Sequence, residues 1–155
     1  MHHIFLQQAV ALARQGMQAG SGGPFGAVIV RNDQIVGRGW NQVTSANDPT
    51  AHAEIVAIRD ACSRLRTFQL AGSVLYASCE PCPMCLAAIY WSRLSAVYFA
   101  SSSSVAAAAG FDDDFIRSEF SLPATGRKLA QTQYLLPDAA ALFDEWRRKL
   151  DKTPY

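Results

Sequence analysis

The sequence predicts an α/β domain built on a mixed sheet. An apolar helical segment is followed by two strand-like runs that a short turn joins, which is typical of an antiparallel hairpin. Further along, strand-like and helical segments alternate, as they do in domains whose helices pack on a partly parallel sheet. The chain has 155 residues, of which 50% are hydrophobic, so it is long enough to bury one substantial core.

The first half of the chain predicts a helix, a hairpin and a second helix, over residues 4–17, 25–41 and 51–65. Apolar side chains recur at helical spacing in the first segment until the glycines within residues 20–23 break the pattern. Asn32 and Asp33 supply the hairpin turn. Residues 43–51 are a polar loop, and Pro49 within it precedes the second helix.

The second half predicts a strand, a helix, a strand, a weak helix, a short helix, a strand and a final helix, over residues 73–78, 84–94, 96–101, 101–110, 111–120, 128–136 and 138–150. Pro83 suits the first turn of the helix that follows it. Pro137 begins the final helix, which ends in the short tail "DKTPY". We find no internal repeat and no long linker, so residues 1–155 are predicted to form a single domain.

The composition narrows the possible functions. A formal charge of +1 and a pI of about 7.7 argue against a dedicated nucleic-acid binder, which usually carries a basic patch. No signal peptide is evident, and no apolar run is long enough to span a bilayer. We therefore expect a cytoplasmic protein, whose thiols stay reduced. In that compartment, clustered cysteines favour metal binding or catalysis over disulfides.

Three of the four cysteines lie within "CEPCPMC", which spans residues 79–85. Cys82 and Cys85 are one turn apart on a predicted helix, so their thiols share one face. Cys79 precedes the turn, on the strand side. A disulfide, an iron–sulfur site, a zinc site, or a working pair beside an idle thiol all fit this spacing. An iron–sulfur cluster would need a fourth cysteine, and Cys62 lies far away in another helix.

A second cluster, "HAE", begins the helix predicted over residues 51–65. His52 can bind a metal through one ring nitrogen. Glu54 lies two positions on, at roughly 100° per residue, so it does not share the face of His52 and is poorly placed as a second ligand. It could still reach a water molecule beside the ion. Taken alone, "HAE" is equally consistent with an ordinary polar helix start.

Together the two clusters match the pattern H-x-E followed by P-C-x-x-C. On these motifs the sequence resembles the cytidine deaminase-like zinc hydrolases. The segments "NDPTAHAEIVAIRDAC" and "LYASCEPCPMCLAAIYWSRLSAVYFA" are similar to the branch that acts on purines. A fuller resemblance, to bacterial guanine deaminases, runs from about Gly22 to Tyr155 and includes "GGPFGAVIV", "GFDDDF" and the terminal tyrosine.

The resemblance implies a three-layer α/β/α fold with a mixed five-stranded central sheet. It implies one zinc ion per chain, held by His52, Cys82 and Cys85, with the fourth position open to water and Cys79 left spare. Glu54 would then act as the general acid and base.

The resemblance also implies hydrolysis of guanine to xanthine and ammonia. The residues expected to contact the base are Phe25, Asn41, Ala53, Trp91, Asp113 and Tyr155. From the residues alone, Phe25 and Trp91 are equally consistent with core aromatics, and Asn41 with a turn asparagine. Asp113 also suits a solvated acidic turn, and its neighbours Asp112 and Asp114 leave the register of the contact open.

By the same resemblance, residues 137–155 are expected to exchange between two subunits of a homodimer. Tyr155 would close the partner's site, although a short polar tail is also typical of disorder. A small-molecule purine is the expected partner, and neither a membrane nor a nucleic acid is. The alternatives are a tRNA adenosine deaminase, a deaminase of a related ring such as cytosine or an amino-triazine, and a zinc-stabilised interaction module without activity. Structural zinc sites usually have four protein ligands, which argues against the last.

Overall fold

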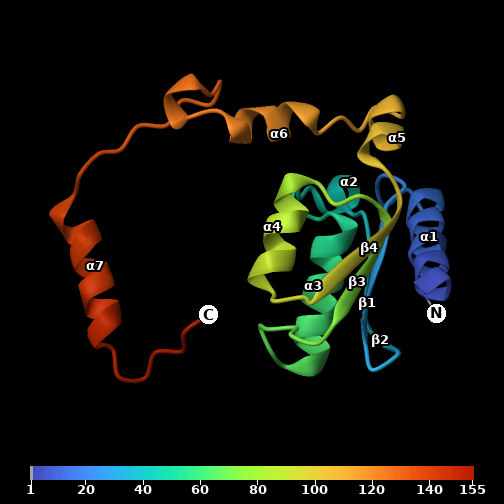
Figure 1. Cartoon of the computed structure of the whole chain (residues 1–155), viewed down its shortest axis with the longest axis horizontal. Helices are drawn as coiled ribbons and strands as arrows, with labels where there is room; N and C mark the ends of the chain where they lie inside the picture. Colours follow the sequence, from blue (N-terminus) through green and yellow to red (C-terminus); the bar gives the residue numbers. More distant parts are fainter. Residues whose placement is uncertain (1) are drawn as a thin grey trace. The chain divides into compact units, whose positions relative to one another are not determined.

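The computed structural model describes residues 2–155, and these form two compact units, one ending at Ile116 and one that covers Arg117–Tyr155. Figure 1 traces the chain from α1 to the carboxyl terminus. The single domain expected over residues 1–155 stays a prediction.

The first unit contains the elements α1 (His2–Gln18), β1 (Gly26–Arg31), β2 (Gln34–Trp40), α2 (Val43–Ala46), α3 (Ala53–Leu65), β3 (Val74–Cys79), α4 (Pro83–Trp91), β4 (Ala96–Ser101) and α5 (Ser103–Ala108). The helices and strands predicted up to residue 101 are thus confirmed within a few residues. Asn32 and Asp33 turn the hairpin with positive φ angles of 50° and 60°, as a two-residue hairpin loop requires. The short helix α2 was not predicted, because its polar sequence has no helical apolar period.

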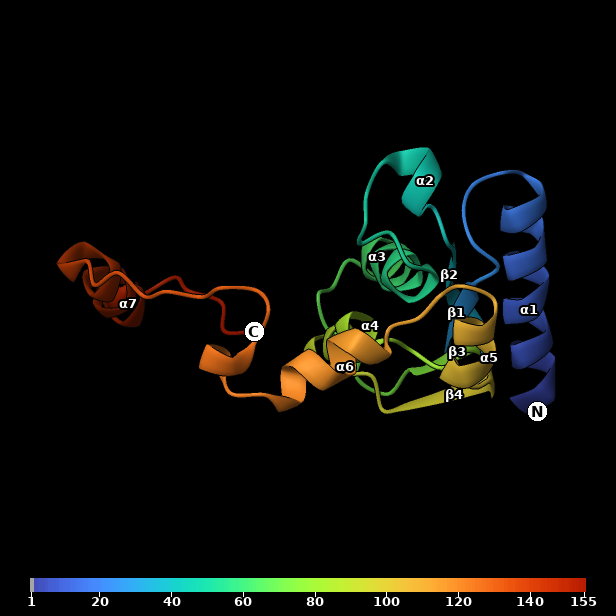
Figure 2. The same ribbon diagram turned by 90° about the horizontal axis from the view of Figure 1, so that it is seen from above.

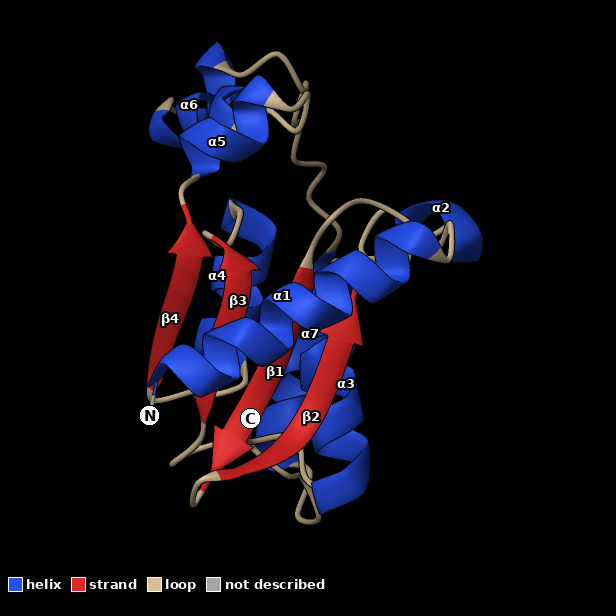
Figure 3. Ribbon diagram, turned by 90° about the vertical axis from the view of Figure 1, so that its right-hand side faces the viewer, coloured by secondary structure: helices blue, strands red, loops and turns tan. Residues whose placement is uncertain are grey.

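The sheet is mixed, as predicted, and has the strand order β2-β1-β3-β4 (Figure 3). β1 is antiparallel to β2 and to β3, whereas β3 and β4 are parallel and are connected through α4. The structure describes four strands, so the expected fifth strand is not confirmed. Residues 128–136, where a strand was predicted, have no strand structure, and Tyr134 and Leu135 are 84% and 83% exposed. A strand needs a paired neighbour, which the apolar pattern of these residues does not supply.

Helices cover both faces of the sheet in the first unit (Figure 2). On one face α1 packs through Phe5 against Val28, Val30 and Tyr76. On the other face α3 and α4 enclose a larger core, which contains Ala27, Ile29, Ala53, Ala57, Ala61, Leu70, Leu75, Ala77 and Ile89. Neighbouring residues of β1 therefore point to opposite layers, as the period of a strand dictates. The three-layer α/β/α arrangement is present.

A glycine in β2 fixes how closely α3 approaches the sheet. A Cβ atom at Gly39 would lie 2.2 Å from the carbonyl oxygen of Ala53, so a side chain there would push the first turn of α3 away. That turn carries His52 and Glu54. The close approach therefore sets the position of the "HAE" cluster.

One edge of the sheet gathers the residues that carry chemistry. Because β1 is antiparallel to its two neighbours and β3 is parallel to β4, the ends of β2, β3 and β4 meet the start of β1 at the same edge. Asn41 follows β2, Cys79 ends β3, and Phe25 precedes β1. Ligands of open α/β sheets commonly bind beyond such an edge.

The second unit contains the end of α6 (Asp114–Ser121), the short helix η1 (Ala124–Gly126) and α7 (Pro137–Arg148), which confirms the predicted final helix. The large apolar side chains of α7 and the tail are exposed; they are Leu142, Phe143, Trp146, Leu150 and Tyr155. Among residues 2–155, no helix has the length and apolar character needed to cross a membrane.

Candidate active site

Three candidate metal ligands lie at the starts of two helices. His52 is the residue that caps the amino end of α3, and Cys82 does the same for α4. Pro83 occupies the first turn of α4, as predicted, and Cys85 follows one turn after Cys82. The two helices pack behind the same edge of the sheet, so their first turns bring the three side chains together.

The three ligand atoms have the spacing that zinc requires. Nδ1 of His52 lies 3.6 Å from Sγ of Cys82 and 3.5 Å from Sγ of Cys85, and all three atoms are within 4.8 Å of one another. Zinc–sulfur bonds of about 2.3 Å and zinc–nitrogen bonds of about 2.0–2.1 Å place tetrahedral sulfur and nitrogen ligands about 3.6 Å apart. The residues fit a zinc ion with one position left open, and Nδ1 is the ring nitrogen that faces it.

Before any metal binds, the pKa values of the two ligand cysteines already differ. A hydrogen bond from the Cys85 thiol, aided by His52, lowers the pKa of Cys82 to about 4 against the opposing effect of burial. The same hydrogen bond, together with burial, raises the pKa of Cys85. The thiolate form is therefore favoured at Cys82, and a metal that binds both thiols would displace the proton of Cys85.

Glu54 lies beside the ligand group but is not part of it. Its side chain is buried in the first turn of α3, with only 7% of the residue exposed, and it lines the same cavity as His52. Burial raises the pKa of this carboxyl group, and the neighbouring Cys82 thiolate acts in the same direction. A carboxyl whose pKa moves toward neutrality is suited to accept and return protons.

A cavity of about 390 Å³ opens beside the ligand group, large enough for a small ring compound. It lies within the first unit. Of the residues predicted to contact a base, Phe25, Asn41 and Asp113 line it. Its other lining residues are Gly23, Val43, Thr44, His52, Glu54, Cys79, Glu80, Cys82, Ser103, Ala106, Gly110, Phe111, Asp112 and Ile116.

The side-chain amide of Asn41 has a fixed orientation. Its Oδ1 accepts hydrogen bonds from the backbone N–H groups of Gly23 and Val43, each at 3.2 Å. Two donors on one atom identify that atom as the oxygen. Within residues 2–155, Nδ2 donates to no protein atom, so it is the group that Asn41 can offer to a ligand. A Cβ atom at Gly22 would lie 2.2 Å from this oxygen, so the glycine leaves the space that the amide needs.

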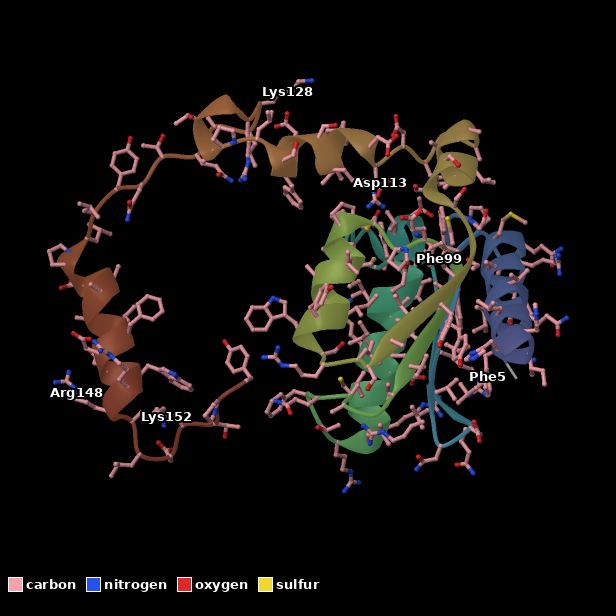
Figure 4. All side chains as sticks on the ribbon, in the orientation of Figure 1. Phe5, Phe99, Asp113, Lys128, Arg148 and Lys152 are labelled. Carbon is pink, nitrogen blue, oxygen red and sulfur yellow. The ribbon has the colours of Figure 1, made fainter. Side chains whose placement is uncertain are left out.

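Two of the three consecutive aspartates at residues 112–114 line one wall of the cavity. Asp113 lies between α5 and α6 (Figure 4) and is half-buried. Asp112 also lines the cavity, but its carboxylate accepts the backbone N–H of Asp114 at 2.9 Å, and Asp114 itself does not line the cavity. Phe111 was not predicted; its ring meets that of Phe25 edge-on, with centroids 4.9 Å apart. An aromatic directly before an acidic run was the sequence signal that could have identified it.

Three other predicted contacts are not among the residues that line the cavity. Trp91 lies at the end of α4 and is 64% exposed. The side chain of Ala53 is buried in the core, so a contact from this residue would have to come from its backbone. Tyr155 belongs to the second unit, and its role stays a prediction.

Comparisons with known proteins agree with this geometry. Residues 1–101 match the family described as the cytidine and deoxycytidylate deaminase zinc-binding region. The chain is 51% identical to guanine deaminase of Bacillus subtilis over 154 residues, which is 99% of each protein. It is 34% identical over 149 residues to the tRNA-specific adenosine deaminase of Aquifex aeolicus, which covers 94% of this chain and 93% of that one.

Solved structures give the same relationship. The X-ray structure of guanine deaminase from Bacillus subtilis has a TM-score of 0.97 at 51% identity and covers 100% of this chain and 99% of that chain. Guanine deaminase from Nitrosomonas europaea has a TM-score of 0.66 at 32% identity, over 70% of this chain and 63% of that one. The fold, the ligand group and these matches together show that the chain belongs to the cytidine and deoxycytidylate deaminase family of zinc-binding enzymes.

Proposed function

We propose that this protein hydrolyses a free purine base, guanine, to xanthine and ammonia. The observation that carries the proposal is a group of three side chains able to bind zinc, beside a buried glutamate, with His52, Cys82 and Glu54 in the wall of one cavity. A 51% identical relative named guanine deaminase points to the same base. The reaction consumes one water for each guanine, forms a carbon–oxygen bond at C2 and breaks the bond from C2 to the amino nitrogen.

In this proposal His52, Cys82 and Cys85 hold the zinc ion. When bound, zinc supplies a Lewis acid that makes water available as hydroxide near neutral pH. Glu54 accepts the proton of that water. It then returns protons to the ring nitrogen beside C2 and to the departing amino group, which leaves as ammonia. Burial supports this role, because a raised pKa lets one carboxyl group both take up and release protons.

Recognition of the base would come from the walls of the cavity. The fixed amide of Asn41 presents an N–H donor, which suits a ring nitrogen or carbonyl oxygen. Asp113 presents acceptor oxygens, which suit the N–H groups of guanine. Phe25 and Phe111 form an apolar surface for a planar ring. Among the three acidic neighbours we favour Asp113, since it is half-buried in the wall of the cavity, whereas Asp112 and Asp114 are exposed.

The proposal also includes a homodimer that exchanges residues 137–155. The support for this dimer is the apolar face of α7, where Leu142 and Phe143 are 63% and 73% exposed. Monomeric proteins rarely expose an apolar surface of this kind. A second copy of the chain would bury that face, and Tyr155 would close a partner's cavity against water. We propose a cytoplasmic location, in which the cysteine ligands stay reduced.

The test is ammonia release from a panel of guanine, adenine, cytosine, an amino-triazine and a tRNA anticodon stem. Guanine should give ammonia and xanthine at the highest kcat/KM. Asp113→Ala should raise KM far more for guanine than for ligands that lack its N–H groups. Turnover of the tRNA adenosine without turnover of guanine would replace the proposed reaction. No ammonia from any substrate by the zinc-loaded protein would favour an interaction module.

A further inference from the structure

Cys79 and Glu80, which lie just before the zinc ligand Cys82, form hydrogen bonds with residues 101–103 at the end of β4 and the start of α5. The backbone N–H of Glu80 donates to the carbonyl oxygen of Ser101 at 2.9 Å. The backbone N–H of Ser103 donates to Oε2 of Glu80 at 3.0 Å, and Sγ of Cys79 donates to the carbonyl oxygen of Ser102 at 3.5 Å. The parallel pairing of β3 and β4 ends at Cys79 and Ser101, so these bonds continue the attachment beyond the sheet.

The segment held in this way forms one wall of the cavity. Ser103 is the first residue of α5, a short helix in which no residue is buried. Phe111 and Asp113 follow it and line the cavity. Because α5 contributes no buried side chain, packing does little to fix its position. Two of the contacts that connect residues 103–113 to the rest of the first unit are the hydrogen bond from the N–H of Ser103 to Glu80 and the contact of Phe111 with Phe25.

We propose that Glu80 is a positioning residue for substrate recognition. Its carboxylate holds the start of α5, so that Phe111 and Asp113 face the base in the cavity. A hydrogen bond from a backbone N–H to a carboxylate is stronger than one between neutral groups. The inference rests on the proposed function, because it requires Asp113 to contact the base.

Two substitutions break the same bond from opposite sides. Glu80→Ala removes the acceptor, and Ser103→Pro removes the donor. Proline is tolerated at the first helical position, and the residue before it must be extended. Ser102 already has φ −82° and ψ 161°, so the backbone accepts the change. Ser104→Ala is the matched control, because Ser104 lies in the same turn of α5 but does not line the cavity.

Both bond-breaking variants should raise KM for guanine by about tenfold, the factor expected for one lost hydrogen bond, with kcat much less affected. The double variant should lose no more than the more affected single variant, because both substitutions remove the bond between residues 80 and 103. Ser104→Ala should keep the original KM. Glu80→Gln, which retains a neutral acceptor, should give a smaller increase than Glu80→Ala.

A background that lacks Asp113 separates positioning from direct contact. In Asp113→Ala, adding Glu80→Ala should raise KM less than it does in the original protein, because only Phe111 is left to be positioned. If Glu80→Ala raises KM while Ser103→Pro does not, Glu80 itself contacts the base and the inference is overturned. It is overturned equally if both variants lose zinc or melt far below the original protein. Absence of guanine turnover by the original protein would instead refute the proposed function.

Discussion

The fixed amide of Asn41 allows its structural role to be separated from its binding role by two substitutions. Asn41→Ala removes the oxygen that accepts the N–H groups of Gly23 and Val43, in a residue that is only 6% exposed. Both N–H groups are only partly buried, so the loss of each acceptor should cost about 1 kcal/mol, the lower end of the range for buried groups. The free energy of unfolding should therefore fall by about 2 kcal/mol for the pair.

Asn41→Asp keeps an oxygen at that position, so both backbone hydrogen bonds can remain. It replaces the Nδ2 donor with a second acceptor, which faces an acceptor of the substrate. A buried acceptor without a donor costs about 1–3 kcal/mol, so KM for guanine should rise about 10- to 100-fold. Stability and zinc content should stay close to those of the original protein.

The assay combines denaturant unfolding, zinc analysis and steady-state ammonia release for both variants. Asn47→Asp is the matched control, because Asn47 is exposed at the end of α2 and does not line the cavity. An unchanged KM in Asn41→Asp would refute the assignment of Nδ2 to the substrate. An unchanged unfolding free energy in Asn41→Ala would refute the cost assigned to the two N–H groups.

Four further outcomes are expected. Glu54→Gln should fold and keep its zinc but lose about 10²–10⁴-fold in kcat, and near-normal turnover would remove its role in proton transfer. Cys82→Ala should lose the metal in zinc analysis, whereas Cys79→Ala should keep it; the reverse result would overturn the ligand assignment. Because burial raises the pKa of Glu54, its base form is lost as pH falls through that raised value, so kcat/KM of the zinc-saturated protein should decline at a higher pH than an ordinary glutamate gives. Deleting residues 151–155 should lower guanine turnover without changing zinc content or unfolding, and full activity in the truncated protein would exclude a lid.

Local patterns predicted most of the fold as far as residue 101, because periodic apolar side chains and turn residues both act at short range. β4 was predicted with its observed bounds, Ala96–Ser101. Residues 128–136 share the composition of a strand but have no strand partner in the structure. Pairing depends on a neighbouring strand distant in sequence, which a local pattern does not specify.

The site was predictable to the extent that a motif fixes spacing. "HAE" and "CEPCPMC" identified the residues that the structure brings together as a ligand group. The locked orientation of Asn41 was not predictable, because one of its two donors, the N–H of Gly23, comes from a loop 18 residues earlier in the chain. Phe111 was missed for a related reason, since its contact with Phe25 joins segments far apart in the chain.

The three cysteines of "CEPCPMC" differ because the backbone changes direction between them. Cys79 ends a strand, and its thiol is used to donate to the carbonyl oxygen of Ser102. After a short turn α4 begins at Pro83, so Cys82 caps that helix and Cys85 follows one turn later. A cap residue and the third helical residue approach each other closely, which is the geometry that places both thiols near Nδ1 of His52. The end of β3 therefore forms hydrogen bonds with the segment that forms one cavity wall, while the start of α4 supplies two metal ligands. Both roles belong to the same seven residues, 79–85.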